Sequence, residues 1–483
     1  MRRLLKRIAM GLGFVILFLA VAVAHYLIFE IAPIGAGYKA KMLCSYLFVS
    51  KRPIEDILKN DLEPFNPLFR YVDVDVDYEN KSVEATAFGL VKRRAFYHDC
   101  LGCTILPSSW KPEQLQFPPA CVEPQPVNPE AVAWPTGDLN AEGAFPTEID
   151  DAKLMTALDS EFSEPPPNPW KPRRTRAVVV VYKGRIVAER YAPGFDRNTP
   201  MHGWSMTKSI TSALVGILVG QGKFKVSDLA PIPAWRNADD AHSKITVDHL
   251  LHMSGGFNFH HDVNPTGKRQ QALFGAIDTT KFAIECPLDA EPGGRWEYAN
   301  ANPHSLWRII RNTVGANDED YLKFPRRALF NRIGMRSAII EPDPYGNPIG
   351  TSFGWATARD WARFGLLYLN DGVWEGERIL PEGWVDYTRT PAPAAGHKHY
   401  GALFWLNAGA KEFANVSWDQ KGDRNIPPFP RLPEDAYFAM GNDGQVVAII
   451  PSRQLVVVRL GLSRSDQTWD YEDFMSDVLA AMK

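Results

Sequence analysis

This chain of 483 residues has no large excess of positive or negative charge. Its 53 lysine and arginine residues nearly balance its 56 aspartate and glutamate residues, which leaves a formal net charge of −3 at pH 7. Proteins that bind nucleic acid usually carry a basic patch, and no stripe of basic residues interleaved with aromatics occurs here. The sequence therefore predicts no nucleic-acid partner.

Two familiar functional signatures are also missing. Thr207 stands where the nucleophile elbow of the α/β-hydrolases, built around a serine such as Ser205, requires a glycine. His249 and His252 have a spacing that suits two ligands on one helix, but no third ligand follows at a plausible spacing. We therefore expect neither a metal ion nor an organic cofactor.

Cysteine is scarce, and four of the five cysteines lie between residues 44 and 121: Cys44, Cys100, Cys103 and Cys121. An oxidising compartment would let these four pair, in one of three combinations that the spacing leaves open. Cys100 and Cys103 also match a redox C-x-x-C motif, but the strand and helix expected around such a motif are not indicated. A structural disulfide is therefore favoured over a redox motif. A zinc site would need a second pair of ligands. Cys286 is expected to be a lone buried thiol.

One long hydrophobic run is present, and it lies at the N-terminus. The basic stretch MRRLLKR precedes Ile8 to Phe29, which carries no formal charge and is interrupted only by His25. At helical rise this run is long enough to cross a hydrocarbon core of roughly 30 Å. The basic flank predicts that the N-terminus stays in the cytoplasm and that the rest of the chain lies outside.

Residues 1–33 can therefore be an uncleaved anchor or a cleaved signal peptide. The small residues Ala22 to Ala24 fit a cleavage site, whereas the apolar residues that continue beyond them favour the anchor. A buried core helix is the third alternative, and the basic flank argues against it. We expect the protein on the periplasmic side of the inner membrane, anchored there or secreted into the periplasm.

A proline-rich stretch divides the rest of the chain. SEPPPNPWKP, residues 163–172, predicts a stiff linker between an accessory segment at 34–165 and a second domain at 166–483. Strand pairs at 176–194 and 444–461 lie at the two ends of this domain, with mostly helical patterns between them. The fold class is therefore α+β, with one antiparallel sheet formed by both ends of the domain, flanking helices and a mostly helical subdomain.

The most informative stretch is MHGWSMTKSITSALVGILVGQG, residues 201–222, in which Ser205 and Lys208 stand three apart before an apolar run. On a helix these two side chains share a face. The helix dipole would favour an oxyanion near Ser205, and the dipole and burial would lower the pKa of Lys208. A neutral lysine accepts a serine proton, which makes the serine a nucleophile. The alternative is a helix-capping serine with an exposed lysine.

A second candidate element is the loop GGRWEYANANP, residues 293–303, which contains Tyr298 and Asn300. A phenol at Tyr298 would relay protons between Ser205, Lys208 and a leaving group. An amide at Asn300 would hold a substrate carbonyl or position the lysine. The Y-x-N pattern recurs elsewhere in the chain, but only here does it follow a Pro-Gly-Gly loop in the middle of the domain.

With both elements in order, residues 170–483 resemble the serine hydrolases related to class C β-lactamases. That family includes penicillin-binding DD-peptidases, esterases and 6-aminohexanoate-dimer hydrolases. Five stretches match in the family's order: WSMTKSITSALVGILVGQGKF, ITVDHLLHMSGGF, PGGRWEYAN, ATARDWARFGLLYLNDGVWEGERILPEGWV and GNDGQVVAIIPSRQLVVVRLG.

The resemblance implies a β-lactamase/transpeptidase-like fold and a role for each motif residue. Ser205 would be the nucleophile, Lys208 its base partner, Tyr298 the proton relay and Asn300 a site amide. The N-terminal features resemble an exported branch of the family, in which Cys44 and Cys103 would form a disulfide.

The third motif of the family is where this chain departs from the pattern. Asn442-Asp443-Gly444 stands in the place of Lys-Thr-Gly, whose cation helps to hold a substrate carboxylate. Asn442 supplies no such charge, and Asp443 would oppose it. This favours a substrate that is neutral or carries an amine. The backbone N–H of Gln445 is expected to be the second oxyanion donor beside that of Ser205.

These observations predict an exported serine hydrolase that cleaves an ester or amide bond of a small molecule through an acyl-enzyme on Ser205. The alternative within enzymes is a peptidoglycan DD-peptidase or β-lactamase. The alternative of another class is a catalytically inactive binding protein on the same fold. We also expect the accessory segment at 34–165 to pack over one side of the site.

Overall fold

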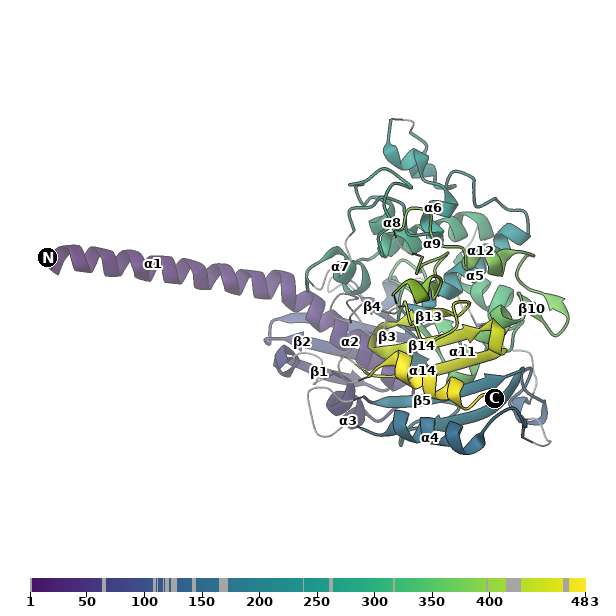
Figure 1. Cartoon of the computed structure of the whole chain (residues 1–483). Coiled ribbons are helices and arrows are strands. Elements are labelled where there is room, and N and C mark those ends of the chain that lie inside the picture. Colours follow the sequence, from purple (N-terminus) through teal and green to yellow (C-terminus); the bar gives the residue numbers. More distant parts are fainter. Residues whose placement is uncertain are drawn as a thin grey trace.

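The computed structural model describes the whole chain except residues 1, 63–66, 107–109, 111, 116, 118–120, 123–127, 141–144, 165–172, 238, 260–263, 316–317, 397, 414–426 and 464–468. The predicted domain boundary at 165/166 lies outside the described residues. The α+β expectation is confirmed by the arrangement of sheets and helices in Figure 1.

A six-stranded antiparallel sheet forms the centre of the molecule, in the order β12-β13-β14-β15-β5-β6. Strand β15 pairs with β5, with Val456 opposite Val181, so the two ends of the predicted domain meet inside one sheet. The strands are β5 (Thr175–Tyr182), β6 (Arg185–Tyr191), β12 (Trp405–Leu406), β13 (Tyr437–Gly441), β14 (Gln445–Ile450) and β15 (Leu455–Gly461).

Helices cover both faces of this sheet because its central strands are apolar on both sides. Alternate residues of a strand point to opposite faces. Val179 and Val181 accordingly pack in the core that contains α5 (Met206–Gly220) and α11 (Ala358–Leu369), whereas Val178 and Val180 pack against α4 and α14. Helix α4 (Asp151–Phe162) precedes the predicted boundary, yet it covers the sheet together with α14 (Tyr471–Ala480).

The segment between the sheet strands is mostly helical. It contains α6 (Val247–Leu251), α7 (Lys268–Phe274), α8 (Thr279–Ile284), α9 (Ala301–Val314) and α10 (Asp318–Pro325). A small sheet of β7 (Met201–His202), β9 (Gly354–Ala356) and β8 (Ile339–Ile340) leads into α5. A hairpin of β10 (Val373–Trp374) and β11 (Glu377–Arg378) precedes α12 (Trp384–Thr388).

The N-terminal helix projects away from this body (Figure 1). Helix α1 (Arg2–Tyr26) continues through a π-helical turn (Leu27–Ile31) into α2 (Ala32–Phe48). Large apolar side chains along α1, such as Phe14 and Phe18, are exposed, whereas most of α2 is buried in the body. This helix is long and apolar enough to cross a membrane, and a signal sequence would share those properties.

The accessory segment forms a four-stranded antiparallel sheet against which α2 packs. Its strands are β1 (Val72–Asp77), β2 (Ser82–Ala87), β3 (Val91–His98) and β4 (Gly102–Leu106), and the short helix α3 (Ile54–Ile57) follows α2. A disulfide between Cys44 and Cys103 joins α2 to β4, and a second joins Cys100 to Cys121. Cys286 is a free, buried thiol.

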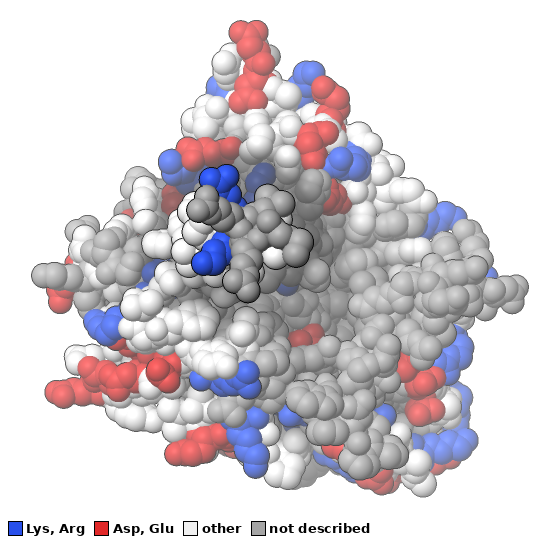
Figure 2. Space-filling model, turned by 90° about the vertical axis from the view of Figure 1, so that its left-hand side faces the viewer, with Lys and Arg blue, Asp and Glu red and all other residues white. Residues whose placement is uncertain are grey.

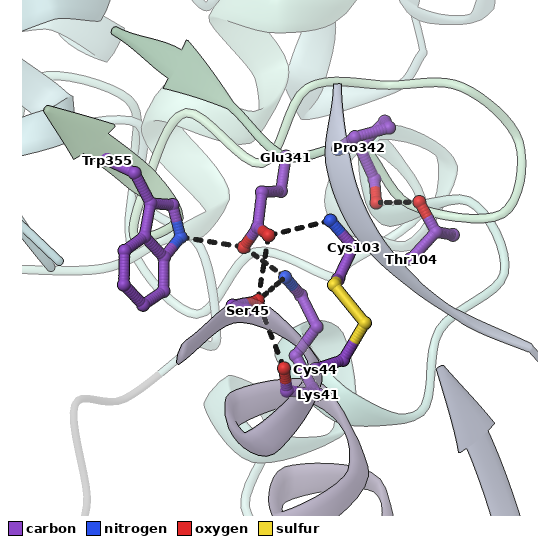
Figure 3. The surroundings of a disulfide bond; sticks show 8 residues. All are labelled: Lys41, Cys44, Ser45, Cys103, Thr104, Glu341, Pro342 and Trp355. Atoms are coloured by element: carbon purple, nitrogen blue, oxygen red, sulfur yellow. Dashed lines mark hydrogen bonds and ion pairs between the residues drawn. A yellow bond between two sulfur atoms is a disulfide. The ribbon is translucent and has the colours of Figure 1, made fainter. Parts of the chain in front are cut away.

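A buried carboxylate fastens the accessory segment to the rest of the body (Figure 3). Glu341 accepts hydrogen bonds of 2.7 Å from the Ser45 hydroxyl, the Cys103 backbone N–H and the Trp355 indole. It also forms an ion pair with Lys41 of α2. Because both charges are buried, loss of either partner would leave an uncompensated charge inside the protein. The accessory segment is therefore held in one position relative to the small β7–β9–β8 sheet.

Candidate active site

Ser205 directly precedes α5 and follows the short connection from β7. It occupies the N-cap position, but its side chain makes no capping hydrogen bond. Lys208 Nζ donates instead to Ser205 Oγ at 2.8 Å and to the Thr351 carbonyl at 2.8 Å. The Lys208 side chain is only 2% exposed. The arrangement therefore differs from a capping serine with an exposed lysine.

The surroundings of Lys208 disfavour its charged form. Burial lowers the pKa of Lys208 well below its ordinary value, and the positive charge of Arg269 lowers this pKa further. A neutral amine has a lone pair that accepts a proton from a hydroxyl within hydrogen-bond distance. The Ser205 and Lys208 pair thus has the hydrogen-bond geometry that a nucleophile and its base require, and burial favours the neutral form of the lysine.

Tyr298 is the third group beside the serine. Burial raises the pKa of the Tyr298 phenol to about 12, against a hydrogen bond with Ser205 that lowers it. Lys208 Nζ lies 4.9 Å from the centre of the Tyr298 ring. Rings of Tyr400 and Trp405 pack on Tyr298 with centroid distances of 5.7 and 5.3 Å and fix its orientation. The phenol stays protonated at neutral pH and is placed to pass a proton on.

Asn300 occupies the N-cap position of α9, two residues after Tyr298. It is buried, and its Oδ1 has no hydrogen-bond partner among the described residues.

The Thr351 carbonyl is a second partner of Lys208. It accepts a hydrogen bond from Lys208 Nζ, as Ser205 Oγ does. The sequence analysis did not identify Thr351, because a backbone carbonyl from a distant loop has no sequence signature.

The strand beside the nucleophile ends at Gly441. A Cβ atom at Gly441 would lie 2.2 Å from the Gly203 carbonyl oxygen and 3.1 Å from the Ser205 nitrogen. Glycine is therefore required for β13 to approach the start of α5 so closely. The strand residue that faces Ser205 is therefore Gly441. It comes one position before Asn442-Asp443-Gly444, the triplet that the sequence analysis assigned to the family's third motif.

The triplet itself forms the turn between β13 and β14. Asp443 has a positive φ of 62°, and its carboxylate accepts a hydrogen bond of 3.2 Å from the Trp204 indole. Gly444 also has a positive φ, of 79°. Asn442 is exposed. The turn brings a carboxylate and an amide to the edge of the site, next to the residue that precedes Ser205.

Gln445 has a different function from the one expected. Its backbone N–H donates to the Asn442 carbonyl within the turn, whereas the sequence analysis expected this N–H to serve as an oxyanion donor. Its buried side chain donates to the carbonyls of Asn442, Asp443 and Gly461. Gln445 thus holds the three-residue turn Asn442–Gly444 in place.

Arg269 is a charged residue that the sequence analysis missed. It lies on α7, and its charge lowers the pKa of both Lys208 and Tyr298. A cation is therefore present near the nucleophile, although it comes from a different element than the family's Lys-Thr-Gly motif. In the sequence Arg269 is one polar residue of a short helix, and only the packing of α7 brings it to the site.

The histidines that were weighed as metal ligands serve local structure. His249 forms a capping box with Thr246 at the start of α6, and His252 Nδ1 lies 3.0 Å from Asp248 Oδ1. Among the residues that the structure describes, no group of three histidine, cysteine, aspartate or glutamate side chains is arranged to hold a metal ion.

Comparisons with known proteins found a family and several relatives of this chain. The family model described as Beta-lactamase matches residues 171–471. A 6-aminohexanoate-dimer hydrolase from Paenarthrobacter ureafaciens is 27% identical over 229 residues, which are 44% of this chain and 56% of that protein. The chain thus spans little more than half the length of this curated relative.

Solved structures share the fold at low sequence identity. A family VIII carboxylesterase superposes with a TM-score of 0.52 and 14% identity, over 70% of this chain and 98% of that chain. A penicillin-binding protein homologue from Caulobacter crescentus gives a TM-score of 0.51 and 14% identity, over 70% of this chain and 99% of that chain. The β-lactamase/transpeptidase-like fold expected from the sequence is confirmed.

The chain belongs to the β-lactamase family. Proteins of this family are serine hydrolases that act on esters and amides, and the proteins named above include a 6-aminohexanoate-dimer hydrolase and a carboxylesterase. The resemblance drawn from the five sequence stretches is therefore confirmed at the level of the family.

Proposed function

We propose that this protein is an exported serine hydrolase that cleaves an ester or amide bond through an acyl-enzyme on Ser205. The observation that carries the proposal is the 2.8 Å hydrogen bond between Ser205 Oγ and the buried amine of Lys208. An ordinary surface lysine is protonated at neutral pH, whereas this one has a strongly lowered pKa. Such a pair has little use in a binding protein that performs no chemistry.

The reaction follows from the positions of the side chains. Lys208 takes the hydroxyl proton as Ser205 Oγ attacks the carbonyl carbon of the substrate. The substrate carbonyl oxygen becomes negative in this step. It is stabilised by the Ser205 N–H at the start of α5 and by the backbone at Gly441 and Asn442. The proton then passes through Tyr298 to the departing alcohol or amine, and the bond to the leaving group breaks.

Water completes the cycle. A water molecule attacks the acyl-enzyme carbonyl and loses one proton to the Lys208 and Tyr298 pair. The ester bond to Ser205 breaks, the serine oxygen regains that proton, and the acid is released. Water is the only co-reactant, so the overall reaction converts the substrate and one water molecule into an acid and an alcohol or amine.

The approach of β13 to α5 gives the first test of this scheme. Gly441→Ala places a methyl group against the Gly203 carbonyl and the Ser205 nitrogen, so the oxyanion donors shift apart. We expect kcat for ester hydrolysis to fall by about 100-fold, as when one oxyanion donor is lost. Gly396→Ala is the matched control, because a Cβ there meets nothing within 4 Å. A folded Gly441→Ala variant with full activity would contradict the scheme.

Arg269 gives a specific reason to keep the second candidate, a DD-peptidase or β-lactamase. Those activities require a cation for a substrate carboxylate, and Arg269 supplies one near the nucleophile from α7. The Asn442 triplet alone favours a neutral substrate, whereas Arg269 favours an anionic group. The substrate class therefore depends on which of these residues faces the bound molecule.

A substrate panel tests the proposed function and this choice together. The full-length protein, in detergent, is offered a neutral ester, an aminoacyl amide and a penicillin, and product release is followed. We expect turnover of the ester or the amide. Arg269→Gln should lower kcat/KM only for substrates with a carboxylate, and Arg295→Gln, an exposed arginine paired with Asp289, is the control.

Absence of turnover and of any covalent adduct with the whole panel, in a protein shown to be folded, would favour the inactive binding protein. An equal effect of Arg269→Gln on neutral and anionic substrates would mean that Arg269 acts through the pKa of Lys208 and not through the substrate.

We further propose that α1 anchors the protein with Ser205 on the periplasmic side, on the basis of its length and exposed apolar side chains.

A further inference from the structure

A cavity of about 230 Å³ lies between the accessory segment and the candidate active site. It is lined by the start of α2, the 3-10 helix Pro67–Tyr71, the first residue of β1, the end of β2, helix α7 and the β13–β14 turn. Most of its wall consists of aliphatic and aromatic side chains, among them Ile34, Leu68, Phe69, Val72, Phe88 and Phe274. An apolar cavity of this kind binds hydrocarbon better than it binds water.

Part of the cavity wall comes from residues next to the candidate nucleophile. Trp204, the residue before Ser205, forms part of its wall together with Asn442 and Asp443 of the β13–β14 turn. Arg269, whose charge acts on Lys208 and Tyr298, also lines the cavity. Asn442, Asp443 and Arg269 thus add polar groups to a wall that is otherwise mostly apolar.

The cavity also reaches the base of the projecting helix. Ile31 and Ala32, where α1 gives way to α2, belong to its wall. Apolar side chains around this point are exposed: Phe29 is 63% exposed, and Leu68 and Phe88 of the wall are 42% and 39% exposed. Figure 2 looks along α1 onto this face, and the described surface around the helix base is mostly uncharged.

We propose that this cavity takes the hydrocarbon chain of an amphiphilic ester or amide drawn from the bilayer in which α1 is anchored. The inference rests on the proposed hydrolase activity and names its substrate class. The polar groups of the cavity wall would present the scissile bond to Ser205, and the exposed apolar side chains would lie at the membrane surface, where a chain can enter without crossing water.

The accessory segment then has a defined role in this arrangement. Four of its elements contribute cavity wall, and the buried Glu341 and Lys41 pair holds them against the body. A single continuous helix connects the candidate membrane span to the cavity wall, because α1 passes into α2 through an uninterrupted helical turn. The cavity is therefore kept at a constant distance from the membrane.

Gly35 offers a way to fill the cavity without disturbing the site. It lines the cavity on α2, and a Cβ there would meet only Phe69 Cε1, at an ordinary contact distance of 3.8 Å. Leucine is also a better helix former than glycine. Gly13→Leu is the matched control, because it adds the same side chain to the same continuous helix, where a Cβ meets nothing within 4 Å.

The experiment compares full-length variants in phosphatidylcholine vesicles. Ester hydrolysis is measured for nitrophenyl acetate and nitrophenyl dodecanoate, and for ethyl and dodecyl acetate, so that a chain on either side of the bond is tested. In Gly35→Leu we expect the long-to-short ratio of kcat/KM to fall by at least about tenfold in one pair, since methylenes leave an apolar pocket. Gly13→Leu should match the wild type. An unchanged ratio in both pairs would overturn the inference.

A second measurement does not depend on turnover. A diazirine-tagged fatty acid in the same vesicles is photolysed, and cross-linked peptides are mapped by mass spectrometry. We expect adducts on peptides that contain Phe69 or Phe274, retained in Gly13→Leu and lost in Gly35→Leu. Such adducts without hydrolysis of any ester would support the cavity and refute the hydrolase. Hydrolysis without these adducts would refute the cavity alone.

Discussion

Replacement of Ser205 by alanine is expected to abolish both hydrolysis and covalent labelling by a fluorophosphonate. The wild-type protein should form an adduct on the peptide that contains Ser205, because the serine hydroxyl is hydrogen-bonded to a lysine whose pKa is lowered by burial. Without the hydroxyl there is no nucleophile, and loss of a nucleophile costs about 10⁴-fold or more in kcat. Peptide mass spectrometry locates the adduct, and steady-state assays with the ester from the panel measure kcat.

Ser209 provides the control for this substitution. It lies one turn further along α5, and its buried hydroxyl donates to the Leu403 carbonyl, so Ser209→Ala also removes a serine from the same helix. We expect Ser209→Ala to lose some stability and to keep its adduct on Ser205. An adduct that persists in Ser205→Ala, or that maps to another serine in the wild type, would remove the basis of the proposed function.

Replacement of Lys208 by methionine is expected to have two effects of opposite kind. Hydrolysis should fall by about 10²- to 10⁴-fold, the usual contribution of a general base. Thermal stability at neutral pH should rise, because methionine can be buried without the cost that burial imposes on an amine. Enzyme assays and thermal melts of the same preparations measure both effects.

The pH dependence of the stability effect follows from the direction of the pKa shift. In the folded protein the pKa of Lys208 is well below 10.5, whereas in the unfolded chain it is ordinary. Between these two values the unfolded chain binds more protons, so the wild-type protein gains stability as pH rises. The advantage of Lys208→Met should therefore grow as the pH falls below 10.5 and should be largest below the lowered pKa of Lys208.

Lys208→Arg separates the two effects. Arginine remains protonated, so it cannot accept the Ser205 proton, and its bulk and charge must be buried at the same place. We expect this variant to be as inactive as Lys208→Met but less stable than the wild type. Acylation by the wild-type protein should increase with pH through the lowered pKa of Lys208 and then level off. A rate that is independent of pH across this range would argue against lysine as the base.

The nucleophile helix could be predicted because its information is local. The helical spacing alone brings Ser205 and Lys208 to one face, and the apolar run behind them predicts burial of the helix. Strand pairs and turn residues are local too, so the α+β arrangement and the meeting of the two chain ends in one sheet were open to prediction. The placement of Tyr298 beside Ser205 was a hypothesis from its position after a Pro-Gly-Gly loop, to which the family resemblance added support.

The residues that sequence analysis missed reach the site from distant elements. The Thr351 carbonyl has no side-chain signature, Arg269 is one polar residue of a short helix, and Gly441 is one glycine among many. The hydrogen bond of the Gln445 N–H within the β13–β14 turn was also missed, because the geometry of that turn depends on the pairing of both strands.

By itself the sequence determined the family, the candidate nucleophile with its candidate base, and the presence of a long apolar N-terminal helix, because each is encoded in contiguous residues. Only the tertiary structure decided which backbone lies against Ser205, which cation is near it, and that residues of α2 and of the β13–β14 turn line one mostly apolar cavity. These features depend on contacts between segments far apart in the chain, and their energies come from packing and burial, which no single stretch of residues specifies.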